Sequence, residues 1–186
     1  MEQKNIDELL EKMEDELSEE RDNSLYSKEA ILEEYADMDI VEAIYQLAEL
    51  ERYELGNDEY ATELYKRAGK MGHSKSLWKL GIIYSAPKFA GGKEDGEKAK
   101  DFYEKAAELG CAEASYELGE IYNSGIGVEQ DKEKALGYFE KSAEDGYPKA
   151  LAKLSVFYAN GIVVEKDMET AYKLAHKAYI ELNNKR

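Results

Sequence analysis

The chain has 186 residues, 43% of them hydrophobic, which is enough for one elongated domain with a core of its own. Its 25 Lys and Arg stand against 41 Asp and Glu, and the resulting net charge of −16 argues against nucleic acid or an anionic membrane surface as the direct partner, because both would repel it. A basic protein is the natural complement of that charge, and solubility alone is the alternative explanation of the acidity.

Residues 1–35 precede the repeated part of the sequence and are predicted to be helical. The first 20 residues carry nine acidic and two basic side chains. Five apolar residues recur among them at helical spacing: Ile6, Leu9, Leu10, Met13 and Leu17. This helix either caps the apolar end of the repeats or reaches out as an acidic arm to a basic partner. The apolar residues favour the cap, because they need a surface to bury against. Ser27 is the predicted N-cap of a second short helix.

From Asp39 onward, a unit of about 36 residues recurs four times, and its clearest copy runs from Ala114 to Ala150. The last copy matches this one at an offset of 36 residues. The preceding copy is offset by 38 in its first helix and 36 in its second, because the loop SAPKFAGGKED holds two extra residues. The first copy has Gly56-Asn57-Asp58 in place of the Gly-x-Gly-Val turn. Such a period predicts a solenoid, since one unit cannot bury its own apolar face and must stack on a neighbour.

The central copy is predicted to form two helices separated by a glycine turn. Apolar residues on one helical face mark the first helix: Ala114, Leu118, Ile121 and Tyr122. Gly125 and Gly127 end it, because glycine accepts the left-handed backbone conformation that helix ends need. Asp131 begins the second helix as an N-cap, and Gly146 closes it. The second helix has its own inner stripe: Ala135, Tyr138, Phe139, Ser142 and Ala143. Gly119 is predicted to let the two helices approach closely, so that a leucine there would overpack the pair.

The last copy departs from this pattern, as terminal repeats commonly do. It has Ser155 where the central copy has Gly119, Val163 where it has Gly127, and Leu182 where it has Gly146.

Residues that could carry chemistry are sparse. The single cysteine, Cys111, is predicted to be a buried free thiol, and the lack of cysteine pairs favours a reducing cytoplasm as the location. The two histidines, His73 and His176, have no second His or Cys at ligand spacing, and the sequence contains no nucleophile-elbow motif. We therefore assign no catalytic residue, metal ligand or cofactor, and we expect the chain not to be an enzyme.

The motif A-x-x-x-L-G-x-x-Y-x-x-G-x-G-V-x-x-D-x-x-K-A-x-x-Y-x-x-K-[AS]-[AS]-E-x-G, from Ala114 to Gly146, resembles the Sel-one-like repeat, a relative of the tetratricopeptide repeat. The resemblance covers about 145 residues when the weaker outer copies are included. It implies an all-α fold, a right-handed α/α superhelical solenoid of about four helix-pair repeats over residues 36–186, with residues 1–35 as an acidic N-terminal helical cap or arm. It also implies a protein that assembles or inhibits other proteins and has no catalytic activity.

The resemblance further implies a binding face, because the first helix of each pair lines the concave side of tetratricopeptide-like solenoids. The family's groove positions carry over to ten predicted protein-binding residues: Glu42, Tyr45, Glu49, Lys75, Trp78, Ile82, Glu113, Tyr116, Glu120 and Asn123. Tyr45, Trp78 and Tyr116 occupy equivalent positions in successive repeats. Their rings would supply buried area, and the neighbouring carboxylates would meet Lys or Arg of a partner. The alternative is that aromatic residues at this position serve packing alone.

These observations together predict a non-enzymatic protein that binds a protein partner of basic character. The specific hypothesis is an inhibitor or immunity-type partner of a basic toxin or nuclease domain, with no direct contact to nucleic acid or membrane. A general adaptor or scaffold, self-associating through its end repeats, is the alternative. A hydrolase is the third hypothesis.

Overall fold

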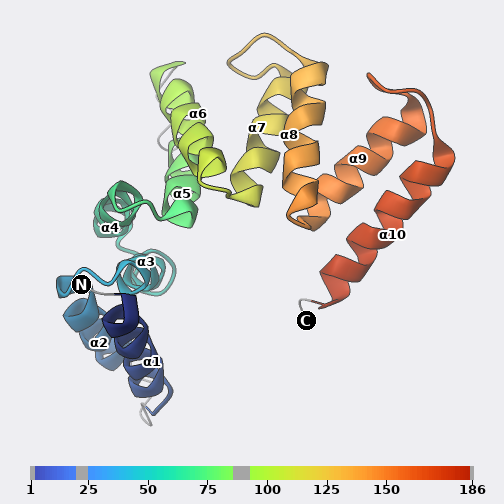
Figure 1. The fold of residues 1–186 in the computed structure, drawn as a ribbon. Helices are drawn as coiled ribbons and strands as arrows, with labels where there is room; N and C mark the ends of the chain where they lie inside the picture. Colours follow the sequence, from blue (N-terminus) through green and yellow to red (C-terminus); the bar gives the residue numbers. More distant parts are fainter. Residues whose placement is uncertain (1–2, 20–24, 86–92, 185–186) are drawn as a thin grey trace. The chain divides into compact units, whose positions relative to one another are not determined.

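A computed structural model of the protein describes residues 3–19, 25–85 and 93–184, and every regular element in these ranges is helical (Figure 1). The elements are α1 (Gln3–Glu19), α2 (Leu25–Asp37), α3 (Val41–Leu50), a π-helical turn η1 (Glu51–Leu55), α4 (Asp58–Lys70), α5 (Ser74–Ser85), α6 (Lys93–Glu108), α7 (Ala112–Ser124), α8 (Lys132–Glu144), α9 (Pro148–Asn160) and α10 (Met168–Asn184). The predicted all-α fold class is confirmed.

The helices from α3 onward form the four predicted repeats, as the pairs α3/α4, α5/α6, α7/α8 and α9/α10. We call α3, α5, α7 and α9 the A helices, and their partners the B helices. The chain divides into two compact units, Met1–Leu80 and Gly81–Arg186, with the division inside α5. Most of the predicted insertion loop falls in residues 86–92, which lie outside the described residues.

In the first unit, α1 packs on α2, and α2 in turn packs on α3. Met13, from the apolar stripe of α1, is fully buried, and the other four stripe residues are half-buried. Helix α2 contributes Leu32, Tyr35 and Ala36 to the core. Ser27 lies inside α2, so its prediction as an N-cap is wrong: the helix is already formed at Leu25.

The first repeat makes its turn by a route that its sequence did not reveal. Helix α3 passes directly into the π-helical turn η1, which ends at Gly56 with a left-handed φ of 74°. Asn57 then caps α4, where its side-chain oxygen accepts a hydrogen bond from the backbone N–H of Tyr60 at 3.3 Å. The π-helical turn therefore connects the two helices of this repeat, as the Gly-x-Gly-Val element does in the central repeat.

In the second unit, the predicted glycine turn and N-cap are confirmed. Gly125 and Gly127 have φ values of 72° and 74°. Asp131 Oδ1 accepts a hydrogen bond from the backbone N–H of Lys134 at 2.9 Å, and this bond lowers the pKa of the Asp131 carboxyl. In the last repeat, Val163 adopts a φ of 65° at the position of Gly127. The turn therefore keeps its backbone geometry although a β-branched residue is strained in the left-handed region.

In the second and third repeats, the close contact between the two helices of the pair is made by a glycine that faces an aromatic ring, whereas the first repeat has Ala48 at the glycine position. A Cβ atom on Gly119 would lie 2.5 Å from the ring of Phe139, and one on Gly81 would lie 2.3 Å from the ring of Tyr103. These separations are far below a normal carbon contact. In the last repeat both members change together, because a serine stands at the glycine position and Ala175 at the ring position.

We predict that Gly119→Ala lowers the free energy of unfolding by about 1–3 kcal/mol, because the new methyl group overpacks the pair. Gly137→Ala, on the exposed side of α8, is the matched control. No atom lies within 4 Å of the added methyl group there, and the higher helix propensity of alanine should stabilise the protein by up to about 1 kcal/mol.

Urea unfolding followed by circular dichroism measures both variants. Adding Phe139→Leu to Gly119→Ala should recover part of the loss, because a smaller side chain gives the methyl group room. A Gly119→Ala protein as stable as the wild type would show that the contact between glycine and ring does not set the helix spacing.

Candidate protein-binding faces

The ten predicted binding residues all lie on A helices, but they fall on two compact units. The unit-1 face is the group on α3 and the start of α5: Glu42, Tyr45, Glu49, Lys75 and Trp78. The unit-2 face is the group on the end of α5 and on α7: Ile82, Glu113, Tyr116, Glu120 and Asn123. All of them are half-buried except Lys75, which is exposed.

On the unit-1 face, Glu49 is engaged within the protein through both of its oxygens. Oε2 forms an ion pair with Lys79 Nζ at 2.8 Å, and Oε1 accepts a hydrogen bond from the Tyr65 hydroxyl. Burial, and after it this hydrogen bond, raises the pKa of Tyr65. The Lys79 ammonium also lies over the rings of Tyr53, at 4.9 Å from the centroid, and Trp78, at 5.5 Å. This carboxylate therefore joins α3 to α4 and α5.

An open cleft of about 410 Å³ borders this pair. Side chains of α1, α2, α3 and η1 line it: Leu17, Lys28, Leu32, Gln46, Glu49, Leu50, Tyr53 and Glu54. Tyr53 is well exposed there, although its ring contacts Lys79. The unit-1 face thus offers an exposed aromatic ring beside a shallow depression.

The unit-2 face contains the same ion pair in the same repeat positions. Glu120 Oε1 lies 2.9 Å from Lys153 Nζ, and the pair joins α7 to α9. Glu120 corresponds to Glu49 in the repeat, and Lys153 corresponds to Lys79. The second repeat has Ile82 at the position that Glu49 and Glu120 occupy in the first and third repeats.

Glu117 of the third repeat is equivalent to Lys79 and Lys153, so a negative charge stands there in place of a positive one. Burial raises the pKa of the Glu117 carboxyl, and Lys149 acts in the opposite direction. Burial chiefly raises the pKa of Tyr103 and of Tyr147 to about 12, and the charge on Glu117 adds to both shifts. A partly dehydrated carboxylate therefore lies among tyrosines on this face. The sequence-based prediction missed Glu117, although a comparison of the ion-pair positions across the repeats would have found it.

Two of the three predicted aromatic residues, Tyr45 and Tyr116, pack against the next repeat. The Tyr45 ring lies 4.7 Å from the ring of His73, and the Tyr116 ring lies 5.4 Å from that of Tyr147. His73 and Tyr147 are the residues that directly precede α5 and α9. Each half-buried tyrosine therefore contacts the start of the next A helix and leaves part of its ring to the solvent. Packing is an observed role of these rings, and it does not exclude contact with a partner.

His73 occupies a structural position. Its Nδ1 atom caps the start of α5, because it accepts a hydrogen bond from the backbone N–H of Ser76 at 3.3 Å. The same atom lies 2.8 Å from the Ser76 hydroxyl. Burial lowers the pKa of His73, and the carboxylate of Glu42, 3.8 Å from Nε2, acts against that shift. The ring is thereby held mainly neutral near pH 7.

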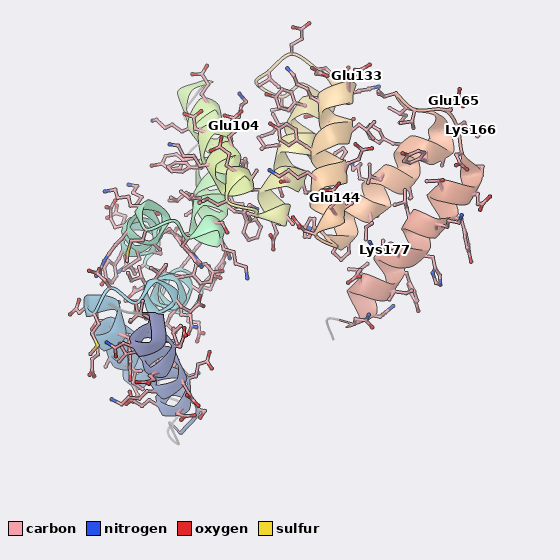
Figure 2. The ribbon with its side chains drawn as sticks, viewed as in Figure 1. Glu104, Glu133, Glu144, Glu165, Lys166 and Lys177 are labelled. Carbon is pink, nitrogen blue, oxygen red and sulfur yellow. The ribbon has the colours of Figure 1, made fainter. Side chains whose placement is uncertain are left out.

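Negative charge is concentrated in the first unit. Residues 1–80 contain 22 acidic and 10 basic residues, a net charge of −12, whereas residues 81–186 contain 19 and 15, a net charge of −4. In the second unit, charged side chains of both signs stand on the helices and in the loop before α10: Figure 2 shows Glu144 on α8, Glu165 and Lys166 in that loop, and Lys177 on α10. Long-range attraction of a basic partner would therefore act mainly on unit 1.

The described ranges contain no cluster of three or more His, Cys, Asp or Glu residues placed to hold a metal ion. Cys111 is a free thiol with 4% of its surface exposed, as predicted, and its Sγ lies 3.4 Å from a carboxylate oxygen of Glu113. Burial raises the pKa of this thiol to about 12. None of the helices in the described part of the chain has both the length and the apolar character needed to cross a bilayer.

The sequence matches a known repeat family, and the matched segments coincide with the four helix pairs. The profile of the family described as Sel1 repeat matches residues 41–73, 74–111, 112–147 and 148–180. No curated protein matches the sequence.

The solved structures that are similar to the chain include the following three. The first is c5321, a protective antigen with an SLR fold present in uropathogenic Escherichia coli strains, at 25% identity and a TM-score of 0.70 over 86% of this chain and 37% of that one. The second is a Sel1 repeat protein from Oxalobacter formigenes, at 24% identity and a TM-score of 0.77 over 84% and 64%. The third is immunity protein PA5088 from Pseudomonas aeruginosa, at 23% identity and a TM-score of 0.63 over 83% and 56%. The chain thus spans between 37% and 64% of the length of these proteins.

We predict a favourable coupling between Glu120 and Lys153 of about 0.5–1 kcal/mol at low ionic strength, because both side chains keep about a third of their surface exposed and water screens the pair. The double-mutant cycle uses Glu120→Gln and Lys153→Met, which preserve the stems that pack on neighbouring residues. Urea unfolding measures the four proteins at about 10 mM and about 500 mM NaCl, and salt should weaken the coupling. A coupling of zero at both concentrations would mean that the pair does not stabilise the stack.

We also predict that the Cys111 thiol reacts with Ellman's reagent at about pH 8 at least about 10³-fold more slowly in the native protein than in urea. The reason is that raising the thiol pKa from its ordinary value to about 12 removes nearly all of the reactive thiolate, and burial further restricts access. The reaction is followed by absorbance. Rapid stoichiometric labelling of the native protein would contradict the burial of this thiol.

Proposed function

The chain belongs to the Sel1 repeat family, whose repeats are protein-interaction modules, and from that premise we propose that it is an immunity-type inhibitor of a basic toxin or nuclease domain. The partner would bind the unit-1 and unit-2 faces of the A helices. No chemistry by this chain is needed, because occupation of the partner's basic cleft is enough to block it.

The charge distribution supports a basic partner. A net charge of −12 on residues 1–80 would steer a positively charged domain toward the first unit and speed its association. The fold is also one that occurs among immunity proteins. PA5088 and Pa5087, both from Pseudomonas aeruginosa, are immunity proteins by description and share the fold at TM-scores of 0.63 and 0.57. Their identities of 23% and 24% support a shared fold and leave the partner of the present chain to experiment.

The proposal rests on one observation, which is that Glu117 places a partly buried carboxylate where the neighbouring repeats have a lysine. At two steps of the array, a lysine of the next repeat neutralises the glutamate at one position of the face, in the pairs of Glu49 with Lys79 and Glu120 with Lys153. At the intervening step the repeat supplies Ile82 and Glu117 instead. A partly dehydrated carboxylate gains more from an ion pair with Lys or Arg than a fully solvated one does. We therefore assign Glu117 as the point at which a basic side chain of the partner docks.

The other residues of the two faces have roles that depend on their contacts within the protein. Glu49 and Glu120 hold the repeats together, so they shape the two faces and contribute to their field. The rings of Tyr116 and Tyr147, which contact each other beside Glu117, would supply apolar area around the docked cation. Trp78 and Tyr45 would supply it on the unit-1 face.

We predict that immobilised wild-type protein captures one basic protein from a lysate of the source cells, and that Glu117→Gln captures at least about 10-fold less of it, since one partly buried charge pair is lost. The triple variant of Tyr45, Trp78 and Tyr116 to alanine should capture none. Glu144→Gln is the matched control, because it removes the same charge from the exposed end of α8, a B helix (Figure 2).

Quantitative mass spectrometry after washes at about 50 mM and about 500 mM NaCl gives the readout, and high salt should release the partner. Circular dichroism verifies that each variant is helical. Equal capture by the wild type and the triple variant would place the interface elsewhere on the chain. Capture that is indifferent to salt would remove charge as the explanation.

The inhibitory role needs a second measurement. Expression of the captured protein alone in a laboratory host should arrest growth, and coexpression of the wild-type chain should restore it, whereas the triple variant should not. If the captured protein is harmless by itself, the immunity role is wrong, and an adaptor role for the same faces is left.

A further inference from the structure

The last helix, α10, exposes an apolar stripe with coiled-coil spacing. Four bulky residues of the stripe are mostly exposed: Met168 at 61%, Tyr172 at 72%, Tyr179 at 67% and Leu182 at 57%. The exposed Ala175 lies between the two tyrosines. Successive members of this α10 stripe are four, three, four and three residues apart, which keeps them on one side of the helix as the a and d positions of a heptad do.

The chain itself shows what covers such a stripe. At an offset of 36 residues, the equivalent positions are Lys132, Leu136, Phe139 and Ala143 on α8, and Gly146 just after it. Phe139 and Ala143 are buried in a core that includes Leu151, Leu154 and Phe157 of α9, and Leu136 packs against that core. The Phe139 ring lies 5.6 Å from that of Phe157. The middle of the α10 stripe, from Tyr172 to Tyr179, is thus equivalent to the part of α8 on which the A helix of the following repeat stacks, whereas Lys132, the equivalent of Met168, is exposed.

The residues of α10 do not suit a helix that ends an array in water. Terminal repeats need a polar outer face for solubility. Here three of the five positions are more apolar or bulkier than in the preceding repeat, with Met168 for a lysine, Tyr179 for an alanine and Leu182 for a glycine, whereas Ala175 is smaller than the phenylalanine it replaces. Within the described residues, nothing covers the bulky side chains of the stripe, so the face is both apolar and unused.

The opposite end of the repeats is covered and cannot receive this stripe. Helix α2 packs on α3, the first A helix, where Ala43, Ile44 and Leu47 are buried. A head-to-tail contact, which would generate a filament, would therefore have to displace α2. A contact between two identical stripes related by a two-fold axis closes on itself and displaces nothing.

We propose that α10 is a self-association surface through which two copies of this chain pair, α10 against α10, in antiparallel orientation. The stripe is complementary to itself, because in either antiparallel heptad register Ala175 of one copy lies opposite a tyrosine of the other, a small residue facing a large one. Charge permits the contact although the chain as a whole is strongly acidic. Helix α10 carries two acidic residues, Glu169 and Glu181, and two basic ones, Lys173 and Lys177, so pairing brings no excess of like charge together.

One helix from each copy makes a small interface, so we expect a dissociation constant in the range of about 1–50 µM. Sedimentation velocity of the full 186-residue chain between about 5 and about 200 µM should show the mass rise from 21.1 kDa toward twice that value.

Tyr179→Lys and, separately, Ala175→Glu should raise the dissociation constant at least about 10-fold, because each places a charge in the centre of the contact. Both side chains are exposed in the single chain, so the substitutions should leave folding intact, as circular dichroism would verify. Ile126→Glu is the matched control: this residue, exposed in the loop after α7, lies outside the stripe and its change should leave the mass unaltered.

A wild-type chain that remains at 21.1 kDa up to about 200 µM would overturn the proposal. So would a dimer that both stripe variants form as readily as the wild type does. The test is independent of the proposed inhibitory function, since it needs no partner protein and its variants leave the A-helix faces untouched.

Discussion

The ring of Phe139 lies where three helices meet. It covers Gly119 of α7, contacts Phe157 of α9 nearly at right angles, and lies against Tyr116 of the unit-2 face. Because Gly119 has no side chain, the ring packs directly on the backbone of α7, and the A and B helices of the repeat approach closely. The opposite side of the ring contacts the next repeat. One contact therefore sets the spacing within a repeat, the stacking between repeats and the position of the candidate binding face.

Stacking brings polar side chains of one A helix close to those of the A helix in the next repeat. Two of the resulting contacts are ion pairs, and at a third step the repeat has no such pair. Glu49 and Glu120 are neutralised by lysines 30 and 33 residues later, which ties neighbouring repeats together. Glu117 carries the opposite charge at the lysine position, and burial disfavours its ionised form. The same repeat position thus carries an ion pair between neighbouring repeats at two steps, and at the third it carries the carboxylate that we propose as a docking point.

The two ends of the array differ in the same physical terms. At one end, α2 covers the first A helix, and the apolar stripe of α1 packs on α2 while its charged residues face the solvent. At the other end, α10 exposes Tyr172 and Tyr179 at the positions of Leu136 and Ala143, which pack in the core of the preceding repeat. Since each repeat contacts only its neighbours, an apolar stripe that the described residues leave uncovered on α10 does not disturb the preceding repeats.

Much of the fold could be predicted from the sequence, because its signals are local. The 36-residue period, the left-handed Gly125 and Gly127, and the cap at Asp131 each depend on a few neighbouring residues, and the sequence alone determined the all-α class, the four repeats and the central turn. Its local signals erred or were silent at Ser27, at the π-helical turn after α3 and at Val163, where contacts elsewhere in the unit override local preference. The candidate site depended on tertiary structure to a greater extent. Only the folded chain shows that Glu49 and Glu120 are engaged within the protein and that Glu117 is partly dehydrated, because ion pairing and burial are decided by side chains about 30 residues away that stacking brings within reach.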